Sequence, residues 1–91
     1  MTSEMVSIHA PHGLNIRPAG EIAEHALGFR CSIVFERADM QVSAKSLLGL
    51  LSLGIDRDTD LKLICDGMDE DKALESMKAF LIRLNEKMDQ E

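Results

Sequence analysis

The stretch that decides the fold is residues 60–88, DLKLICDGMDEDKALESMKAFLIRLNEKM. In its first six residues, Leu61, Leu63 and Cys65 alternate with Asp60, Lys62 and Ile64, which is typical of a strand with one buried face. Beyond Gly67, apolar residues recur at intervals of three and four, as on an amphipathic helix. They are Ala73, Leu74, Met77, Phe80, Leu81, Leu84 and Met88. Acidic residues 69–71 precede them, where the helix dipole favours negative charge. The stretch predicts a strand followed by a long surface helix.

The same two periodicities predict the elements that come before this stretch. We expect strands at residues 5–10, 31–36, 40–42 and 60–65, and helices at residues 18–27, 46–53 and 73–88. Gly28 is expected to end the first helix in the left-handed conformation. Strands interleaved with helices, but too closely connected for parallel crossovers, predict one α+β domain over residues 1–91. Its antiparallel sheet would carry helices on one face.

Composition restricts the kinds of partner. The chain has 16 acidic and 10 basic residues, a net charge of −6. This charge argues against nucleic-acid binding and favours protein partners with basic patches.

No apolar run reaches the roughly 20 residues of a membrane span, and the N-terminus has no signal pattern, so a cytoplasmic location without membrane contact is expected. Cys31 and Cys65 are interpreted as reduced thiols. His9 and His25 are interpreted as surface residues without metal-binding spacing. No metal site, cofactor or self-contained enzyme is expected.

The first candidate site is residues 10–19, APHGLNIRPA. A strand ends here, Gly13 permits a turn, and a helix begins near Ile16 or Arg17. The first amides of a helix lack internal partners and attract anions. The guanidinium of Arg17 could grip two phosphate oxygens. Asn15, Ile16 and Arg17 are therefore predicted to bind phosphate. The alternative is that Asn15 is only an N-cap and Arg17 only a solvated charge.

The second candidate site is residues 43–54, SAKSLLGLLSLG. Ser46 is placed as the N-cap of a short helix, where added phosphate charge is favourable. The five leucines at 47, 48, 50, 51 and 53 are too many for a short helix to bury. We expect the surplus to form an exposed apolar patch that binds a protein. The alternative is that Ser46 only caps the helix and every leucine packs inward.

These two motifs resemble those of the HPr family of phosphocarrier proteins. Residues 13–19, GLNIRPA, are similar to the family's active-site motif Gly-Leu-His-x-Arg-Pro-Ala, and residues 43–54 are similar to its regulatory-serine motif. The resemblance extends from about residue 6 to about residue 84. It implies an open-faced sandwich with sheet order 1-4-2-3 and three helices on one face. It also implies phosphorylation of Ser46 by HPr kinase/phosphorylase, binding to a LacI-type transcriptional repressor, and contacts with enzyme I and sugar-transporter components. Arg17, Leu47, Leu48 and Leu51 are expected to contact partners.

The chain departs from the active-site motif at Asn15, where the family carries its phosphorylated histidine. An amide nitrogen is a very poor nucleophile, because its lone pair is delocalised into the carbonyl. The Crh-type members of the family also lack this histidine and keep the serine. We therefore expect a regulatory protein without a catalytic residue. Three alternatives stay open: a phosphocarrier that uses His12 in the same turn, a phosphocarrier in which Asn15 was introduced for histidine, and a docking domain without a switch.

Overall fold

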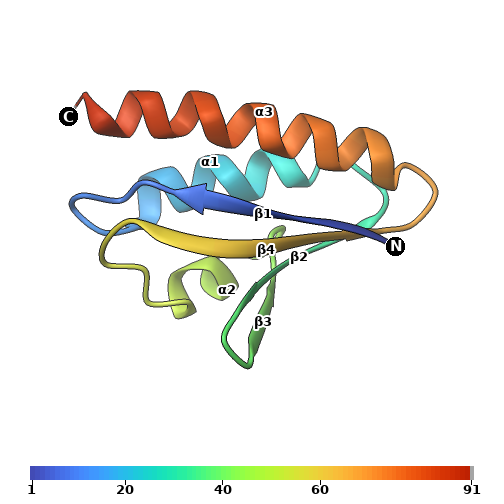
Figure 1. Cartoon of the computed structure of the whole chain (residues 1–91), viewed down its shortest axis with the longest axis horizontal. Coiled ribbons are helices and arrows are strands. Elements are labelled where there is room, and N and C mark those ends of the chain that lie inside the picture. The colour runs from blue at the N-terminus through green and yellow to red at the C-terminus, as the bar shows by residue number, and fades with distance from the viewer. Residues whose placement is uncertain (91) are drawn as a thin grey trace.

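The computed structural model describes residues 1–90, which form seven elements in the order βαββαβα (Figure 1). The strands are β1 (Thr2–Ile8), β2 (Ser32–Arg37), β3 (Met40–Ser43) and β4 (Thr59–Asp66). The helices are α1 (Ile16–Ala26), α2 (Leu47–Ser52) and α3 (Glu70–Asp89). The predicted order of strands and helices is confirmed.

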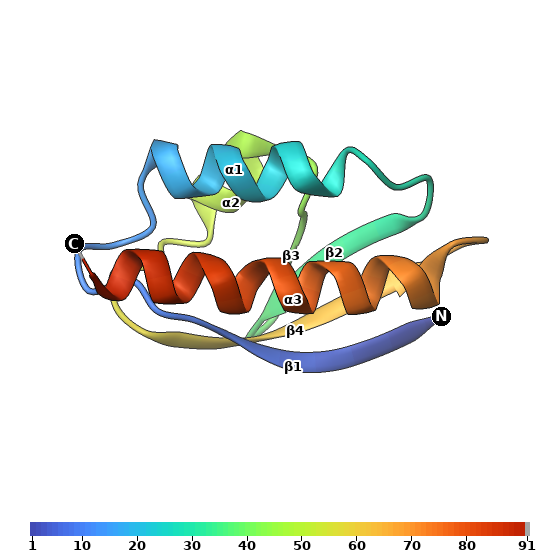
Figure 2. The same cartoon turned by 90° about the horizontal axis from the view of Figure 1, so that it is seen from above.

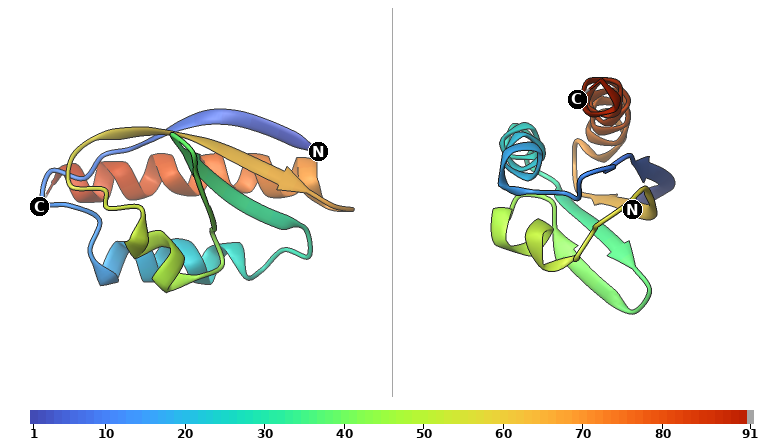
Figure 3. Two further views of the ribbon diagram at one scale, coloured as in Figure 1. Left: turned by 90° about the horizontal axis from the view of Figure 1, so that it is seen from below. Right: turned by 90° about the vertical axis from the view of Figure 1, so that its left-hand side faces the viewer.

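The four strands form one antiparallel sheet in the order β1-β4-β2-β3. Helices α1 and α3 lie side by side on one face, and α2 lies next to α1 (Figure 3). The α+β class, the sheet order and the placement of the helices on one face are therefore as expected. Because β1 and β3 are the two edge strands, the central pair β2 and β4 is the most enclosed part of the sheet.

The core lies between the central strands and the helices. Ile33, Phe35, Leu61, Leu63 and Cys65 alternate along β2 and β4 with side chains at most 1% exposed. The predicted faces of α1 and α3 pack against them, and the buried residues join into a single apolar cluster. A polar link joins this core to the sheet edge. Asn85 Oδ1 accepts from the His9 N–H at 2.9 Å, and Asn85 Nδ2 donates to the Ser7 carbonyl at 2.8 Å.

Strand β1 was predicted at residues 5–10 but spans Thr2–Ile8. The polar residues at its start hide the alternation, and pairing with β4, from Thr2 opposite Cys65 to Ile8 opposite Thr59, sets its length. Ala10 lies beyond the strand, although it is buried. Its N–H donates to Asp58 Oδ1 at 2.9 Å, so a side chain replaces the sheet as its partner.

The role predicted for Gly28 was wrong. The C-cap residue of α1 is Leu27, with φ −64° and ψ −15°, and Gly28 is absent from the positive-φ residues of the described chain. The helix ends instead in tightened i to i−3 bonds: the Gly28 N–H donates to His25 O at 3.1 Å, and the Phe29 N–H donates to Ala26 O at 3.2 Å. Helix ends of this kind need no left-handed residue.

One of the three acidic residues at the start of α3 also bonds to a distant segment. Asp69 is the N-cap residue, but its side chain makes no cap bond. Its carboxylate accepts from the backbone N–H groups of Arg30 at 3.0 Å and Cys31 at 2.8 Å. The bond from Arg30 is the main reason why the pKa of Asp69 lies below its ordinary value. Asp69 therefore ties the start of β2 to the start of α3.

Cys31 and Cys65 are both buried free thiols, as the sequence suggested. Burial, followed by the hydrogen bond with Asp69, raises the pKa of the Cys31 thiol to about 11.

Neither α1, α2 nor α3, the helices of residues 1–90, combines the length and the apolarity that crossing a bilayer requires.

Candidate functional site

The turn between β1 and α1 fixes the first site. The Gly13 N–H donates to Ala10 O at 3.0 Å, and Gly13 has φ +82°, a conformation that favours glycine. Leu14 follows as a buried anchor, and its N–H donates to Ile55 O at 2.8 Å. Because Leu14 points into the core, Asn15 comes next on the outside, at the start of α1.

Asn15 is the N-cap residue of α1. Its backbone is extended, with φ −92° and ψ −176°, and its Oδ1 accepts from the Arg17 N–H at 3.1 Å. Pro18 has no N–H, and the Ala19 N–H donates to Asn15 O at 3.1 Å. Within residues 1–90 this leaves the Ile16 N–H as the donor of the first turn without an acceptor. The N-cap reading of Asn15 is confirmed. Phosphate binding by Asn15, Ile16 and Arg17 stays a prediction, and it would require an anion to share or replace this cap bond.

Asn15 lines two small adjoining hollows at this end of the molecule. His12 shares the first hollow with it, together with Pro18 and Met88. Arg17 and Lys87 share the second. Lys87 comes from the last turn of α3, and its Nζ lies 2.9 Å from Glu21 Oε1. Lys87 could not be identified from the sequence, because nothing in the local pattern shows that residue 87 lines the same hollow as residue 15. The hollows bring one imidazole and two cationic groups near Asn15.

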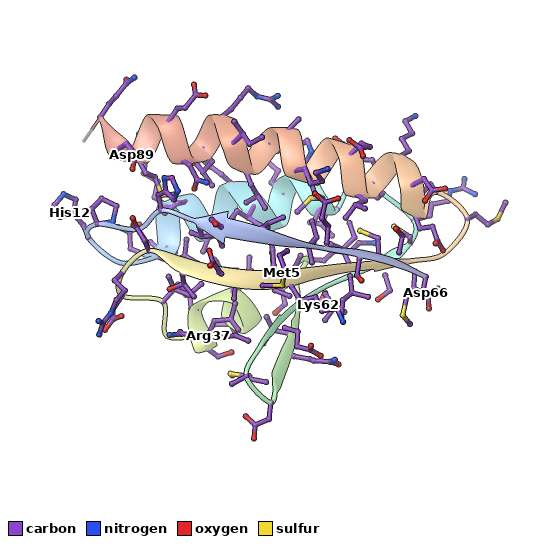
Figure 4. The ribbon with its side chains drawn as sticks, viewed as in Figure 1. Met5, His12, Arg37, Lys62, Asp66 and Asp89 are labelled. Carbon is purple, nitrogen blue, oxygen red and sulfur yellow. The ribbon has the colours of Figure 1, made fainter. Side chains whose placement is uncertain are left out.

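His9 lies at the same end but is committed elsewhere. Its ring Nδ1 is 3.1 Å from Asp89 Oδ2, and this hydrogen bond is the main cause that raises the pKa of His9. Figure 4 shows His12 and Asp89 at one end of the molecule and Asp66 at the other. His25 sits far along α1, where its Nε2 is 2.9 Å from Ser76 Oγ. Of the three histidines, His12 alone lines the hollow that Asn15 occupies.

Ser46 is the N-cap residue of α2, as predicted. Its Oγ accepts from the Gly49 N–H at 3.0 Å, and its carbonyl accepts from the Leu50 N–H at 3.0 Å. A Cβ on residue 49 would lie 3.2 Å from Ser46 Oγ and 3.3 Å from Val42 Cβ. Glycine at position 49 therefore lets α2 and its cap approach β3 closely. At the other end of α2, Arg37 Nη1 donates to Leu53 O at 2.8 Å.

The leucines beside Ser46 divide between core and surface. Leu50 and Leu53 are buried, Leu47 and Leu51 are half-buried, and Leu48 is 78% exposed. An exposed surplus is therefore confirmed at Leu48, and the alternative in which every leucine packs inward is wrong. Partner binding by these leucines is not decided by their exposure and stays a prediction.

Two exposed apolar residues at the two ends of α1 add to these leucines, and neither was predicted to lie on an apolar surface. Ile16 is 65% exposed and Leu27 is 64% exposed. They are eleven residues apart, about three helical turns, so they lie on one face of the helix. α1 and α2 are in contact, whereas Glu21 and His25, which bond to Lys87 and Ser76 of α3, lie on a different side of the helix. Ile16, Leu27, Leu48 and the half-buried Leu47 and Leu51 are called the α1–α2 surface below. The sequence signal for this surface was the presence of apolar residues, Ile16 and Leu27, outside the buried face of α1.

The sequence and the fold are similar to those of known proteins. The family described as "PTS HPr component phosphorylation site" matches residues 2–83. "HPr-like protein Crh" of Bacillus subtilis is 35% identical over 81 residues, which are 89% of this chain and 95% of that protein. "Phosphocarrier protein HPr" of Buchnera aphidicola from Acyrthosiphon pisum is 34% identical over 84 residues, 92% of this chain and 99% of that protein. The solved structure of HPr-C-His from Thermoanaerobacter tengcongensis has a TM-score of 0.85 at 29% identity, and the match covers 94% of this chain and 97% of that one. The chain therefore belongs to the HPr family, whose members are phosphocarrier and regulatory proteins rather than enzymes.

Proposed function

We propose that this chain is a regulatory HPr-like protein that is phosphorylated on Ser46 and then binds a protein partner. HPr kinase/phosphorylase would add the phosphoryl group from ATP, and the partner would be a LacI-type transcriptional repressor in the cytoplasm. The observation that carries the proposal is Asn15, which stands where the family motif has its histidine and serves as the N-cap of α1. In this function the protein takes no part in phosphohistidine transfer, and phosphorylation of Ser46 is the event that regulates it.

The chemistry of Asn15 supports the loss of the relay. A carboxamide offers no free nitrogen lone pair for attack on phosphorus. Its oxygen is also engaged with the Arg17 N–H. Two cationic groups line the hollow beside Asn15: Arg17, and Lys87, which is paired there with Glu21. A phosphoryl group at this position would therefore have cationic neighbours but no nucleophile to carry it.

The position of Ser46 supports the switch. Ser46 is half-buried at the N-terminal end of α2, directly before Leu47 and two residues before the exposed Leu48 of the α1–α2 surface. A phosphoryl group there would add about 1.5–2 negative charges beside an apolar contact surface. Ionic and apolar recognition in one patch would let a partner distinguish the phosphorylated protein from the unmodified one.

Replacing Ser46 gives the direct test. After incubation with ATP, Mg²⁺ and HPr kinase/phosphorylase, we expect intact-mass analysis to show one phosphoryl group on the native chain and none on Ser46→Ala. The Ser46→Ala protein should also lose about 1 kcal/mol of stability, because the N-cap bond to Gly49 is removed. Ser52→Ala is the matched control. Ser52 lies in the same short helix, and its Oγ donates to Gly49 O at 2.6 Å. Full phosphorylation of Ser46→Ala, or none of the native chain, would contradict the proposal.

Leu48 tests the α1–α2 surface. Leu48→Ala should weaken binding of the Ser46-phosphorylated protein to the repressor about 5- to 30-fold, the effect of about 1–2 kcal/mol at an interface anchor. Its stability should stay almost unchanged, because the side chain is already 78% exposed. Ile82→Ala is the control, since Ile82 is 59% exposed on α3. Titration calorimetry measures the affinity of both variants for the repressor. Equal losses for the two variants would argue against a contact at Leu48.

A phosphocarrier that uses His12 is the second candidate, and the hollow shared by His12 and Asn15 favours it. Phosphoenolpyruvate and enzyme I would then phosphorylate the native chain, and His12→Gln would abolish the modification. If the native chain receives no phosphoryl group in this experiment, the His12 phosphocarrier is excluded. The coding sequence at position 15 tests another alternative: a histidine codon in the source genome would make Asn15 an introduced replacement in a working phosphocarrier that serves enzyme I and sugar transporters.

A further inference from the structure

The groove between α1 and α3 contains a hollow on the other side of α1 from the α1–α2 surface. The two helices run antiparallel here (Figure 2). The hollow has a volume of about 540 Å³ and is lined by Glu21, Glu24, His25, Gly28, Phe29 and Phe80. Two of the three phenylalanines of the chain are therefore gathered at one surface position. Neither Asn15 nor Ser46 contributes to it.

The aromatic rings of the hollow are held in a fixed arrangement. The His25 and Phe80 rings stack with centroids 4.4 Å apart and planes 15° apart. Phe29 approaches His25 edge-on at 5.8 Å. Two hydrogen bonds support this arrangement: His25 Nε2 lies 2.9 Å from Ser76 Oγ, and Lys45 Nζ donates to Phe29 O at 2.6 Å. Phe29 and Phe80 are only partly buried, so ring surface remains available. Ring faces carry partial negative charge and attract cations.

The acidic groups of the hollow act in the same direction. Glu21 is already paired with Lys87 at 2.9 Å, and Arg83 lines an adjoining hollow with Glu21 and Phe80, so Glu24 is the acidic residue of the hollow that is left for a partner. Glu24 is exposed at the rim, and no basic group of residues 1–90 lies within ion-pair distance of it. A carboxylate without a cation beside partly exposed rings matches the needs of a guanidinium group. Such a group stacks on aromatic faces and donates in a planar fork to carboxylates.

We propose that this hollow receives an arginine side chain of a protein partner, with the guanidinium against the Phe29 and Phe80 rings and hydrogen-bonded to Glu24. Arginine fits better than lysine, because an ammonium group is more strongly hydrated and does not stack. The net charge of −6 adds a general attraction for basic partner surfaces. Binding at this hollow should not require phosphorylation of Ser46, because Ser46 does not line it.

The test is an NMR titration of the full chain with N-acetyl-arginine amide. The matched control ligand is N-acetyl-citrulline amide, which has nearly the same shape and no charge. We expect saturable shifts of the Phe29 and Phe80 ring resonances and of the Glu24 amide with the arginine compound. Glu24→Gln should weaken this binding about two- to fivefold, the range for an exposed ion pair. Glu75→Gln is the control variant, because Glu75 is exposed elsewhere on α3 and lies 3.7 Å from Lys78.

Four results would overturn the proposal. They are equal shifts from citrulline, equal affinity for choline, no effect of Glu24→Gln, and no saturation at the highest soluble concentration. A fifth would replace the occupant: shifts of Phe29 and Phe80 that grow with protein concentration alone would mean that a second copy fills the hollow. Because Glu24 is exposed, Glu24→Gln should fold like the native chain, and a circular dichroism melt checks this directly. Phe80→Leu supplies an independent loss of binding if its melt shows a folded protein.

Discussion

Asn15→His should convert the chain from a protein that enzyme I does not phosphorylate into one that it does. With phosphoenolpyruvate and enzyme I, we expect an acid-labile phosphoryl group on residue 15, at a rate on the order of 10³-fold or more above the native chain. The reason is local. The backbone that presents residue 15 is fixed by the Leu14 anchor and the Gly13 turn, so an imidazole would stand where the carboxamide stands now. Arg17 and Lys87 are in place beside it.

Two further variants give this experiment its controls. Asn15→Gln should stay unmodified, since it alters the side chain without supplying a nucleophile. The double variant Asn15→His with Arg17→Ala should accept the phosphoryl group more slowly, because a guanidinium near the reacting group is lost. If Asn15→His stays unmodified while a histidine-containing HPr is phosphorylated in the same mixture, more than the nucleophile has been lost. The enzyme I contact surface would then have diverged as well, and the regulatory role would rest on two changes.

The parts of the fold that could be predicted from the sequence are those set by local patterns. The alternation in β2 and β4 and the apolar face of α3 follow from the periods of strand and helix, and both are buried as expected. The cap at Ser46 was predictable for the same reason, because the hydroxyl and the Gly49 N–H that it accepts from are three residues apart. Asn15 could be predicted as an N-cap. The sequence could not decide whether it also binds an anion, because an N-cap and an anion ligand occupy the same position at the start of the helix.

The parts that could not be predicted depend on contacts between distant segments. Lys87 reaches the vicinity of Asn15 only because α3 runs back along α1. The carboxylate of Asp69 leaves its own helix for the amides of Arg30 and Cys31, which lie nearly forty residues earlier. The start of β1 is polar in sequence and is defined by its ladder with β4. Packing decides these contacts, and no pattern within one segment reports them.

Gly67→Ala should be the most damaging single-methyl substitution at a glycine of this chain. Gly67 has φ +148°, a conformation that side chains rarely adopt. A Cβ there would lie 2.8 Å from Cys31 Cβ and 2.9 Å from Cys31 Cα, closer than van der Waals contact allows. We expect the free energy of unfolding to fall by about 2–4 kcal/mol, from strained backbone and overpacking together. Urea denaturation followed by circular dichroism measures the loss.

The size of that loss depends on whether the neighbours can move, and the hydrogen bonds indicate that they cannot move freely. Cys31 is held by its N–H bond to Asp69, and the Gly67 N–H donates to Glu70 Oε1 at 3.1 Å. Gly20→Ala is the opposite case: Gly20 sits inside α1, and apart from the adjacent backbone of that helix no atom lies within 4 Å of the added Cβ. Alanine there should stabilise the protein by about 0.5–1 kcal/mol. Similar midpoints for the two variants would show that the turn between β4 and α3 yields at little cost, and the tie through Asp69 would then be weaker than its geometry indicates.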